Sequence, residues 1–382
     1  MYNLDLNKLS QEEFLKAYWQ KKPVVIRQGF KDFVDPISID EFAGIAMEES
    51  VQSRLVSKIN GEWNAEFGPF ESYDHLGEQD WSLVIQALDN FSEEAAELIE
   101  PFRFLPHWRL DDLMASFATK GGSVGPHVDN YDTFICQGSG SRLWRVGDKG
   151  QHTEIIAHEA LLHVEPFSAI IDIEMQAGDI LYIPPGFPHE GVALEPSMSF
   201  SIGFRANSAI SLLSGFADYL IDNDLGEQLL EDPDRLPIKH SGEITNKDYS
   251  SIKKQLQNLL DDDELFQSFT GTFLSNAKHE LDLMPSEEPF ENEEVSSLMA
   301  VHGIKRLGGL RALYFENSIN KGVFYLNGEK TYFNSDISPI IKLICDQTIV
   351  MPDELLPWRE NVDFVSLMAT LLDQGYWFWT EA

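Results

Sequence analysis

Hydrophobic and polar positions alternate over short distances in the first hundred residues, which predicts a mixture of short helices and strands. The predicted elements are a helix at 10–20, a strand at 22–30, a helix at 38–49, a hairpin at 51–70 and a helix at 80–102. Ser10 precedes Glu13 by the spacing of a capping box, so we expect the first helix to begin there. Asn60-Gly61 lies between two apolar runs and predicts a tight hairpin turn.

The pattern changes between about residue 111 and residue 207. Short runs of β-branched and aromatic residues alternate there with glycine and proline turns, as in DLMASFATK, SRLWRVGD and SMSFSIGFRAN. Many short strands at this spacing are typical of an antiparallel barrel or jelly roll. We therefore predict a mainly β domain with flanking helices.

Helical periodicity follows after residue 207. Two amphipathic segments, 208–229 and 250–275, are separated by a loop that contains proline. The last part of the chain mixes short helices with one hairpin that turns at Asn327-Gly328, and helices with a two-stranded wing indicate a winged-helix-like α+β domain. The predicted domain ranges are 1–207, 208–285 and 286–382.

The composition adds a strong negative charge to this picture. The chain has 28 Lys and Arg residues against 63 Asp and Glu residues, a formal net charge of −35. Such a field repels the phosphates of nucleic acids and attracts basic partners, so we expect no direct nucleic-acid binding. Solubility or a salt-adapted proteome explains the charge as well as a basic macromolecular partner does.

Membrane and disulfide chemistry find little support in the sequence. No apolar run approaches the roughly 18 residues that suggest a membrane span, and the first residues lack a signal-peptide pattern. We therefore expect a cytoplasmic protein with no membrane partner. Cys136 and Cys345 fall in different predicted domains, which favours two reduced core residues over a disulfide or a cysteine zinc site.

Two motifs in the predicted β domain carry candidate metal ligands. GGSVGPHVDNYD places His127 and Asp129 two residues apart, so on a strand both side chains point to one face. AGDILYIPPGFPHEG follows an apolar strand with a rigid Pro-Pro-Gly turn that delivers His189 to a strand end. Each motif alone has a simple structural explanation. Together, two histidines and one carboxylate match the facial triad of non-heme Fe(II) oxygenases.

The residues GPHVD, SRLWRVG and DILYIPPGFPHEG together resemble the JmjC-type, cupin-fold 2-oxoglutarate oxygenases. More narrowly, LMASFATKGGSVGPHVDNYDTFICQGSGSRLWRVG is similar to the bacterial ribosomal oxygenases that hydroxylate an arginine of large-subunit ribosomal protein L sixteen. The resemblance implies a double-stranded β-helix (jelly-roll) catalytic domain, an α-helical dimerisation region and a winged-helix-like C-terminal domain. It therefore also implies a homodimer.

The same resemblance implies roles for individual residues. The Fe(II) ligands would be His127, Asp129 and His189. Ser116 and Arg142 would bind the distal carboxylate of the cosubstrate 2-oxoglutarate, and dioxygen would be the oxidant. Arg145 competes with Arg142 for this role, but residues three apart on a strand face opposite sides, so only one can point inward.

The substrate implied by the resemblance is a basic large-subunit ribosomal protein. The resemblance implies that the enzyme hydroxylates an arginine of that protein, as a ribosomal protein arginine 3-hydroxylase. A guanidinium needs carboxylate or aromatic partners, and the pocket candidates are Asn130, Tyr131 and Asp132. Lys120 does not fit this role, because a cation does not help to bind arginine. Two alternatives stay open: a JmjC-type hydroxylase or demethylase of another basic protein, and a non-catalytic cupin scaffold.

Other conspicuous residues have structural explanations. The remaining histidines lack rigid framing, and we expect each to be structural or solvated: His75, His107, His152, His158, His163, His240, His279 and His302. The aromatic run from Trp377 to Trp379 resembles a nucleic-acid stacking platform, but in so acidic a chain packing within the terminal domain is favoured.

Overall fold

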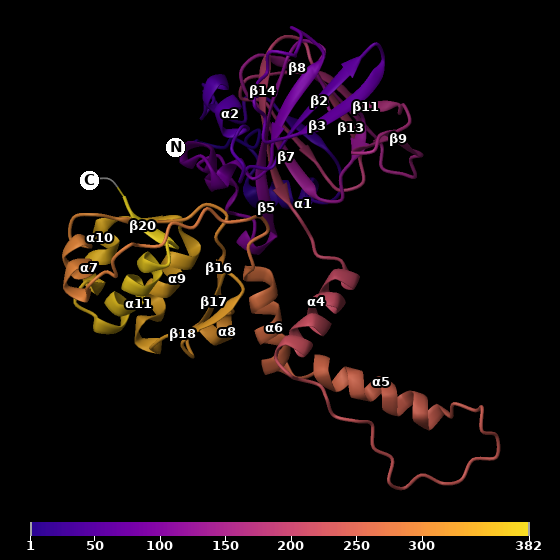
Figure 1. Cartoon of the computed structure of the whole chain (residues 1–382), viewed down its shortest axis with the longest axis vertical. Coiled ribbons are helices and arrows are strands. Elements are labelled where there is room, and N and C mark those ends of the chain that lie inside the picture. The colour runs from indigo at the N-terminus through magenta and orange to yellow at the C-terminus, as the bar shows by residue number, and fades with distance from the viewer. Residues whose placement is uncertain (1, 381–382) are drawn as a thin grey trace. The chain divides into compact units, whose positions relative to one another are not determined.

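The structure is a computed structural model that describes residues 2–380, and its elements are labelled in Figure 1. Contacts within the chain divide it into two compact units. The first unit contains the residues up to Ala206, together with Lys278–Met284 and Leu307–Gly309; the second contains the remainder. The division into 1–207, 208–285 and 286–382 stays a prediction.

The first unit is built from two antiparallel sheets and a separate hairpin, the jelly roll predicted from the sequence. The larger sheet has the order β1-β12-β7-β14-β5-β4-β2-β3 and the smaller β11-β8-β13-β6. The larger sheet consists of β1 (Val24–Ile26), β2 (Ser53–Ile59), β3 (Glu62–Phe67), β4 (Trp81–Ile85), β5 (Leu110–Ala118), β7 (Asp132–Gln137), β12 (Ile180–Ile183) and β14 (Ser197–Phe204). The smaller sheet consists of β6 (His127–Val128), β8 (Ser141–Gly147), β11 (Ala169–Gln176) and β13 (Pro188–Ala193), and β9 (Glu154–His158) pairs with β10 (Leu161–Val164).

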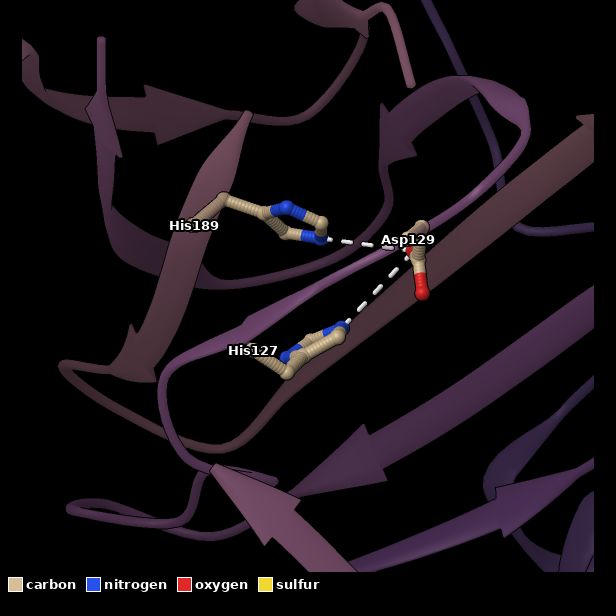
Figure 2. A group of neighbouring side chains, drawn as sticks. All are labelled: His127, Asp129 and His189. Atoms are coloured by element: carbon tan, nitrogen blue, oxygen red, sulfur yellow. Dashed lines mark ion pairs between the residues drawn. The ribbon is translucent and has the colours of Figure 1, made fainter. Parts of the chain in front are cut away.

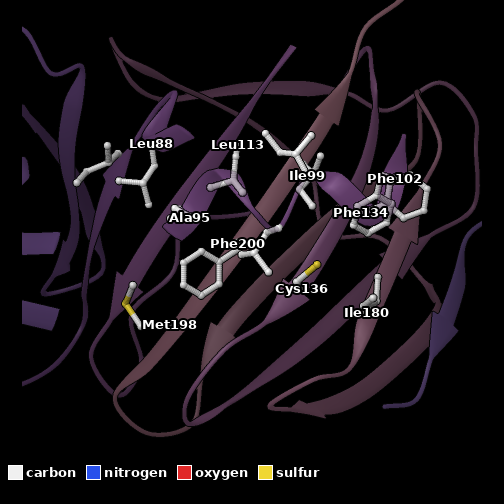
Figure 3. Packing of buried hydrophobic residues seen from close by; sticks show 14 of the residues in the cluster. Leu88, Ala95, Ile99, Phe102, Leu113, Phe134, Cys136, Ile180, Met198 and Phe200 are labelled. Carbon is white, nitrogen blue, oxygen red and sulfur yellow. The ribbon is translucent and has the colours of Figure 1, made fainter. Parts of the chain in front are cut away.

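The strands in the middle of the larger sheet are buried on both faces and so build two cores. Phe134 and Cys136 of β7 face a large, aromatic-rich core (Figure 3). The intervening Ile135 faces a smaller core between the two sheets, where Trp144 and Val146 of β8 pack against it. Because successive side chains on a strand alternate faces, a slip of one residue would exchange the two sets, and the register is therefore well specified.

Short helices cover the large core of this unit. They are α1 (Gln11–Ala17), α2 (Ile39–Ile45), α3 (Glu93–Ala96) and the 3₁₀ turns η1 (Leu88–Asn90), η2 (Glu100–Phe102) and η3 (His107–Arg109). The predicted capping box is confirmed, since Ser10 and Glu13 bond each other's backbone N–H at the start of α1. The hairpin turn is confirmed as well, because Asn60 and Gly61 both have positive φ angles, 54° and 88°, as a tight turn requires.

The predicted helix at 80–102 is wrong in its first part. Trp81–Ile85 forms strand β4, which pairs with β2 on one side and β5 on the other. A continuous apolar run suits both a buried helix and a central strand, and pairing partners distant in sequence favour the strand here. The remainder of the segment forms only η1, α3 and η2, and Ala87, with a φ angle of 52°, stands between the strand and these turns.

The second unit contains the helical region and the C-terminal α+β part. Its helices are α4 (Ala209–Asp222), α5 (Asn246–Leu260), α6 (Asp263–Ser275), α7 (Asn292–Leu298), α8 (Glu316–Ile319), α9 (Ser338–Asp346), α10 (Pro352–Leu355) and α11 (Val362–Asp373), with 3₁₀ turns η4 (Ser335–Ile337) and η5 (Leu356–Trp358). Its strands are β15 (Ile304–Arg306), β16 (Ala312–Leu313), β17 (Val323–Leu326), β18 (Glu329–Tyr332), β19 (Ile349–Val350) and β20 (Trp377–Trp379).

Three predictions for this unit differ in outcome. The segment 250–275 is not one helix, because Asp262 accepts a hydrogen bond from the Leu265 N–H and starts α6 afresh after α5. The hairpin at Asn327-Gly328 is confirmed by the pairing of β17 with β18. The favoured packing of the terminal aromatic run holds for Trp377, which is buried where β20 pairs with β15.

The structure bears on the predictions for the cysteines and for membrane-spanning segments. Both cysteines, Cys136 and Cys345, are buried and free. Across residues 2–380, no helix is both long enough and apolar enough to cross a bilayer.

Candidate metal centre and cosubstrate cavity

Three side chains converge at one end of the smaller sheet (Figure 2). His127 on β6 and His189 on β13 are direct partners across the antiparallel pair, and Asp129 lies one residue beyond the end of β6. A carboxylate oxygen of Asp129 is 3.8 Å from Nε2 of His127 and 3.5 Å from Nε2 of His189. One ligand atom from each of the three residues lies within 4.8 Å of the other two.

Both imidazole rings are oriented by backbone carbonyl groups. Nδ1 of His127 donates to the Gly125 carbonyl at 2.9 Å, and Nδ1 of His189 donates to the Phe187 carbonyl at 3.1 Å. Hydrogen bonds of this kind fix the tautomer and leave each Nε2 lone pair free for a metal. Burial, reinforced by the neighbouring His127, lowers the pKa of His189 to about 4. His189 is therefore neutral, as a ligand must be, at physiological pH.

This donor set fits Fe(II). Two imidazole nitrogens and one carboxylate oxygen on one side of an ion leave further coordination positions open on the other side. Nitrogen and oxygen donors bind Fe(II) well, whereas soft metals prefer thiolate ligands. Within residues 2–380, these three residues are the group of histidine, cysteine and acidic side chains that lie close enough together to hold an ion.

A cavity of about 330 Å³ adjoins the three ligands, and Arg142 on β8 contributes to its wall. Arg142 is only 6% exposed, and its guanidinium donates to Ser116 Oγ, Ser197 Oγ and the two backbone carbonyls of the same serines, each at 2.9 Å. Among the described residues, no carboxylate lies within ion-pair distance of it. Burial lowers the pKa of Arg142 to about 9, so the group is still cationic at neutral pH.

A buried cation held only by neutral groups is a receptor for an anion. Ser116 lines the same cavity and orients the guanidinium, so the two residues predicted for the cosubstrate lie together. Arg145, the competing arginine, has a 38% exposed side chain 3.5 Å from Asp172 and lies outside the cavity. The structure thus places Arg142 inward and Arg145 outward, as strand alternation requires.

The three predicted substrate-pocket residues separate in the structure. Tyr131 lines the cavity, whereas Asn130 is exposed and outside it. Asp132 is buried in a different network, where it accepts hydrogen bonds from Tyr182 Oη at 2.6 Å and Gln20 Nε2 at 2.9 Å. Lys120, the cation that did not fit a substrate pocket, is exposed and does not line the cavity.

One histidine that the sequence did not single out lies behind the metal ligands. His163 on β10 lines the cavity, and its Nε2 donates to the Val124 carbonyl at 2.9 Å. A Cβ at Gly125, whose φ angle is 84°, would lie 2.3 Å from this ring, so the loop before His127 can approach His163 only with glycine there. The sequence carries no local signal for this contact, because 36 residues separate His163 from His127.

The jelly roll and its metal-ligand set define the class of protein: a JmjC-type oxygenase with a cupin fold. A model of the JmjC domain matches residues 97–212, and a model of a ROXA-like winged helix matches residues 258–378. The chain is 46% identical over 378 residues to Ribosomal protein uL16 3-hydroxylase of Escherichia coli, covering 99% of both chains. It is 33% identical over 336 residues to a probable ribosomal oxygenase of Haemophilus influenzae, covering 84% of this chain and 82% of that protein.

Solved structures agree with these relatives. The X-ray structure of E. coli YcfD matches with a TM-score of 0.93 at 45% identity, covering 99% of this chain and 100% of that one. The ribosomal oxygenase YcfD of E. coli in complex with cobalt and 2-oxoglutarate matches with a TM-score of 0.91 at 44% identity over 100% of both chains. The chain therefore belongs to the JmjC-domain ribosomal oxygenase family. The predicted fold class, including the winged helix, is confirmed.

Proposed function

We propose that this protein is an Fe(II)- and 2-oxoglutarate-dependent hydroxylase of an arginine side chain in a large-subunit ribosomal protein. The observation that carries the proposal is the presence, in one cavity, of a metal-ligand triad and of a buried guanidinium without a carboxylate partner among the described residues. A dicarboxylate cosubstrate matches both features, because one end can bind the metal while the other pairs with Arg142.

Each group of residues has a separate task in this proposal. His127, Asp129 and His189 hold Fe(II), and Ser116 with Arg142 holds the distal carboxylate of 2-oxoglutarate. The bound iron, with 2-oxoglutarate and dioxygen, supplies the oxidising chemistry that converts a substrate C–H group to C–OH. The protein fixes the geometry through the carbonyl-bonded imidazoles, and the apolar core between the sheets keeps water from that side of the cavity.

A ribosomal protein substrate is supported by two independent facts. The E. coli relative, 46% identical along the whole chain, is named for 3-hydroxylation of ribosomal protein uL16. The net charge of −35 favours association with a basic protein. Tyr131 lines the cavity next to the metal ligands. The Arg205 guanidinium already lies over its ring, with the guanidinium carbon 5.4 Å from the ring centroid, so a substrate guanidinium would have to use the other face of the ring. A protein that modifies a ribosomal protein is expected to act in the cytoplasm.

The test is a hydroxylation assay with matched variants. Purified protein, Fe(II), 2-oxoglutarate and oxygen are incubated with unmodified large-subunit ribosomal proteins, and products are analysed by mass spectrometry. We expect one protein to gain the mass of one oxygen atom on an arginine, with formation of succinate. His127→Ala and Asp129→Ala should abolish the gain, whereas His240→Ala, in an exposed loop, should not.

The alternatives predict different products in the same assay. A lysine demethylase would release formaldehyde from a methylated substrate, and a non-catalytic scaffold would form no succinate with any substrate. A hydroxylated residue other than arginine would keep the class of enzyme and reject the proposed target.

A homodimer formed through the helical region is supported by the apolar side chains that α4 and α5 leave uncovered in the single chain. Ile210 and Leu213 of α4 are 78% and 60% exposed, and Tyr249 and Leu256 of α5 are 63% and 62% exposed. Exposed apolar side chains gathered on two helices are typical of a surface that another protein covers. A second copy of the chain is the partner that the family resemblance implies.

A further inference from the structure

A second cavity, of about 450 Å³, lies beside the metal cavity in the same compact unit. The two cavities share wall residues from β2, β4 and β5 and from the residue after β4: Arg54, Val84, Met114 and Gln86. The two cavities therefore adjoin each other along these strands. In the proposed function the metal cavity takes up one substrate side chain and the cosubstrate, which leaves the second cavity for the polypeptide that flanks that side chain.

One wall of the second cavity comes from a part of the chain that is distant in sequence. Lys278–Met284 follows the helical region but belongs to the first compact unit. His279 Nε2 lies 3.6 Å from Asp112 Oδ2 on β5, and the Glu280 carbonyl accepts a hydrogen bond from Asn90 Nδ2 at 3.1 Å. His279 and Glu280 both line the cavity, although they lie outside the range matched by the JmjC domain model.

The rim of the second cavity combines negative charge with an exposed aromatic ring. Glu49 and Glu280 are exposed at the cavity, and Phe67 at the end of β3 is 65% exposed. The basic groups of the wall are Arg54 and His279, and His279 already faces the carboxylate of Asp112. Carboxylates and an aromatic face are the groups that bind lysine and arginine side chains.

We infer that the second cavity binds an extended, basic segment of the substrate polypeptide next to the hydroxylated residue, with Glu280, Glu49 and Phe67 as the contacting groups. This inference rests on the proposed function and adds a specificity surface to it. Lys278–Met284 then serves substrate recognition, and the helical region delivers it to the jelly roll. The net charge of −35 disfavours a polyanion as the occupant.

Direct binding tests this inference without turnover. The probe is a fluorescein-labelled peptide with a central arginine flanked by lysines, and the reference is the same peptide with serines in place of the lysines. We expect the Glu49→Lys/Glu280→Lys variant to bind the lysine-flanked peptide about tenfold or more weakly in fluorescence anisotropy, because reversed rim charges oppose a basic ligand. The loss should be at least about fivefold smaller for the serine-flanked peptide.

The controls separate folding and general charge from recognition. Glu12→Lys makes the same kind of charge reversal at one position of α1, away from both cavities, and should leave the binding of both peptides as in the native chain. Glu280→Gln removes charge without reversing it and should give an intermediate loss, and unchanged thermal melting should show that each variant is folded. Equal loss for both peptides, no loss in the double variant, or no binding of the lysine-flanked peptide to the native protein would overturn the inference.

Failure of the proposed function has a different signature. If the native protein binds the lysine-flanked peptide through Glu49 and Glu280 but forms no succinate with Fe(II) and 2-oxoglutarate, the second cavity stands and the hydroxylase proposal is rejected. If succinate forms but substitution of both glutamates leaves the affinity for the lysine-flanked peptide unchanged, the hydroxylase proposal stands and the second cavity has no role in recognition.

Discussion

Arg142 shows how a single buried residue can define the chemistry of a cavity. Its guanidinium has four hydrogen bonds, all to oxygen atoms of Ser116 and Ser197, and none of these partners carries charge. Such a cation is costly to bury, since desolvation disfavours its charged form. In the proposed function, the anionic cosubstrate that binds beside the metal-ligand triad offsets this cost.

Arg142→Lys should raise KM for 2-oxoglutarate about tenfold or more, because a hydrogen bond to a charged group contributes about 1.5–3 kcal/mol and tenfold corresponds to about 1.4 kcal/mol. Lysine keeps the charge but cannot reproduce the planar fork of donors. Succinate formation at varied 2-oxoglutarate measures the change. Arg145→Lys is the matched control and should leave KM unchanged, and similar KM values for both variants would argue against the assignment of Arg142.

His163 contacts the loop that precedes His127, and we expect it to orient that metal ligand through the loop. Replacing it by leucine removes the hydrogen bond to the Val124 carbonyl, and we expect about tenfold weaker Co(II) binding, the scale typical of groups that orient metal ligands. Titration followed by the visible absorption of Co(II) measures the affinity directly. His163→Gln keeps an N–H donor and should therefore retain most of the Co(II) affinity. An equal loss of Co(II) affinity in the leucine and glutamine variants would indicate that His163 has a packing role instead.

At the scale of elements, the strands of the catalytic unit were easier to predict than the segments between them. β7 and β12 carry apolar runs bounded by turns, Phe134–Cys136 and Ile180–Ile183, and their two-sided burial follows from that pattern. β4 was mistaken for a helix because its apolar run, Trp81–Ile85, is short enough to fit either period. What decides the matter is pairing with β2 and β5, and neither partner is visible from the local sequence.

The apolar faces of α4 and α5 lead to a prediction about assembly. Leu213→Glu combined with Leu256→Glu should convert the proposed dimer to a monomer, because each change places a charge on an apolar surface that the proposed contact would bury. Analytical ultracentrifugation or light scattering measures the mass in solution. Val34→Glu makes the same kind of change at a 73% exposed position of the first unit and should leave the mass unaltered. A native chain that sediments as a monomer would reject the dimer.

At the scale of the whole molecule, the dominant property is charge. A formal charge of −35 over 382 residues makes the protein attractive to a basic substrate at a distance. This long-range term is independent of the contacts in the cavities and acts on the rate of encounter rather than on the chemical step.

Salt should therefore slow the reaction with a protein substrate. Raising the ionic strength from about 20 mM to about 300 mM should lower kcat/KM for the ribosomal protein about tenfold or more, because screening shortens the range of the field. Initial rates at low substrate concentration measure this effect. Succinate formation without protein substrate is the control for direct effects of salt on the metal site, and a flat profile for the protein substrate would exclude electrostatic steering.

The sequence by itself determined the strand-rich class of the catalytic unit, the helical region, both hairpin turns and the identity of the candidate ligands. These features depend on local periodicity, turn residues and the spacing of His127 from Asp129, all of which act over a few residues. Family resemblance added Ser116 and Arg142.

Only the tertiary structure decided how distant segments meet. The register of β6 against β13 puts His127 directly opposite His189, 62 residues away, and the loop at Gly125 brings in His163. The return of Lys278–Met284 to the catalytic unit likewise has no local signal. Such contacts depend on strand pairing and on packing between segments far apart in the chain. Neither strand pairing nor long-range packing produces a local hydrophobic periodicity from which the contacts could be predicted.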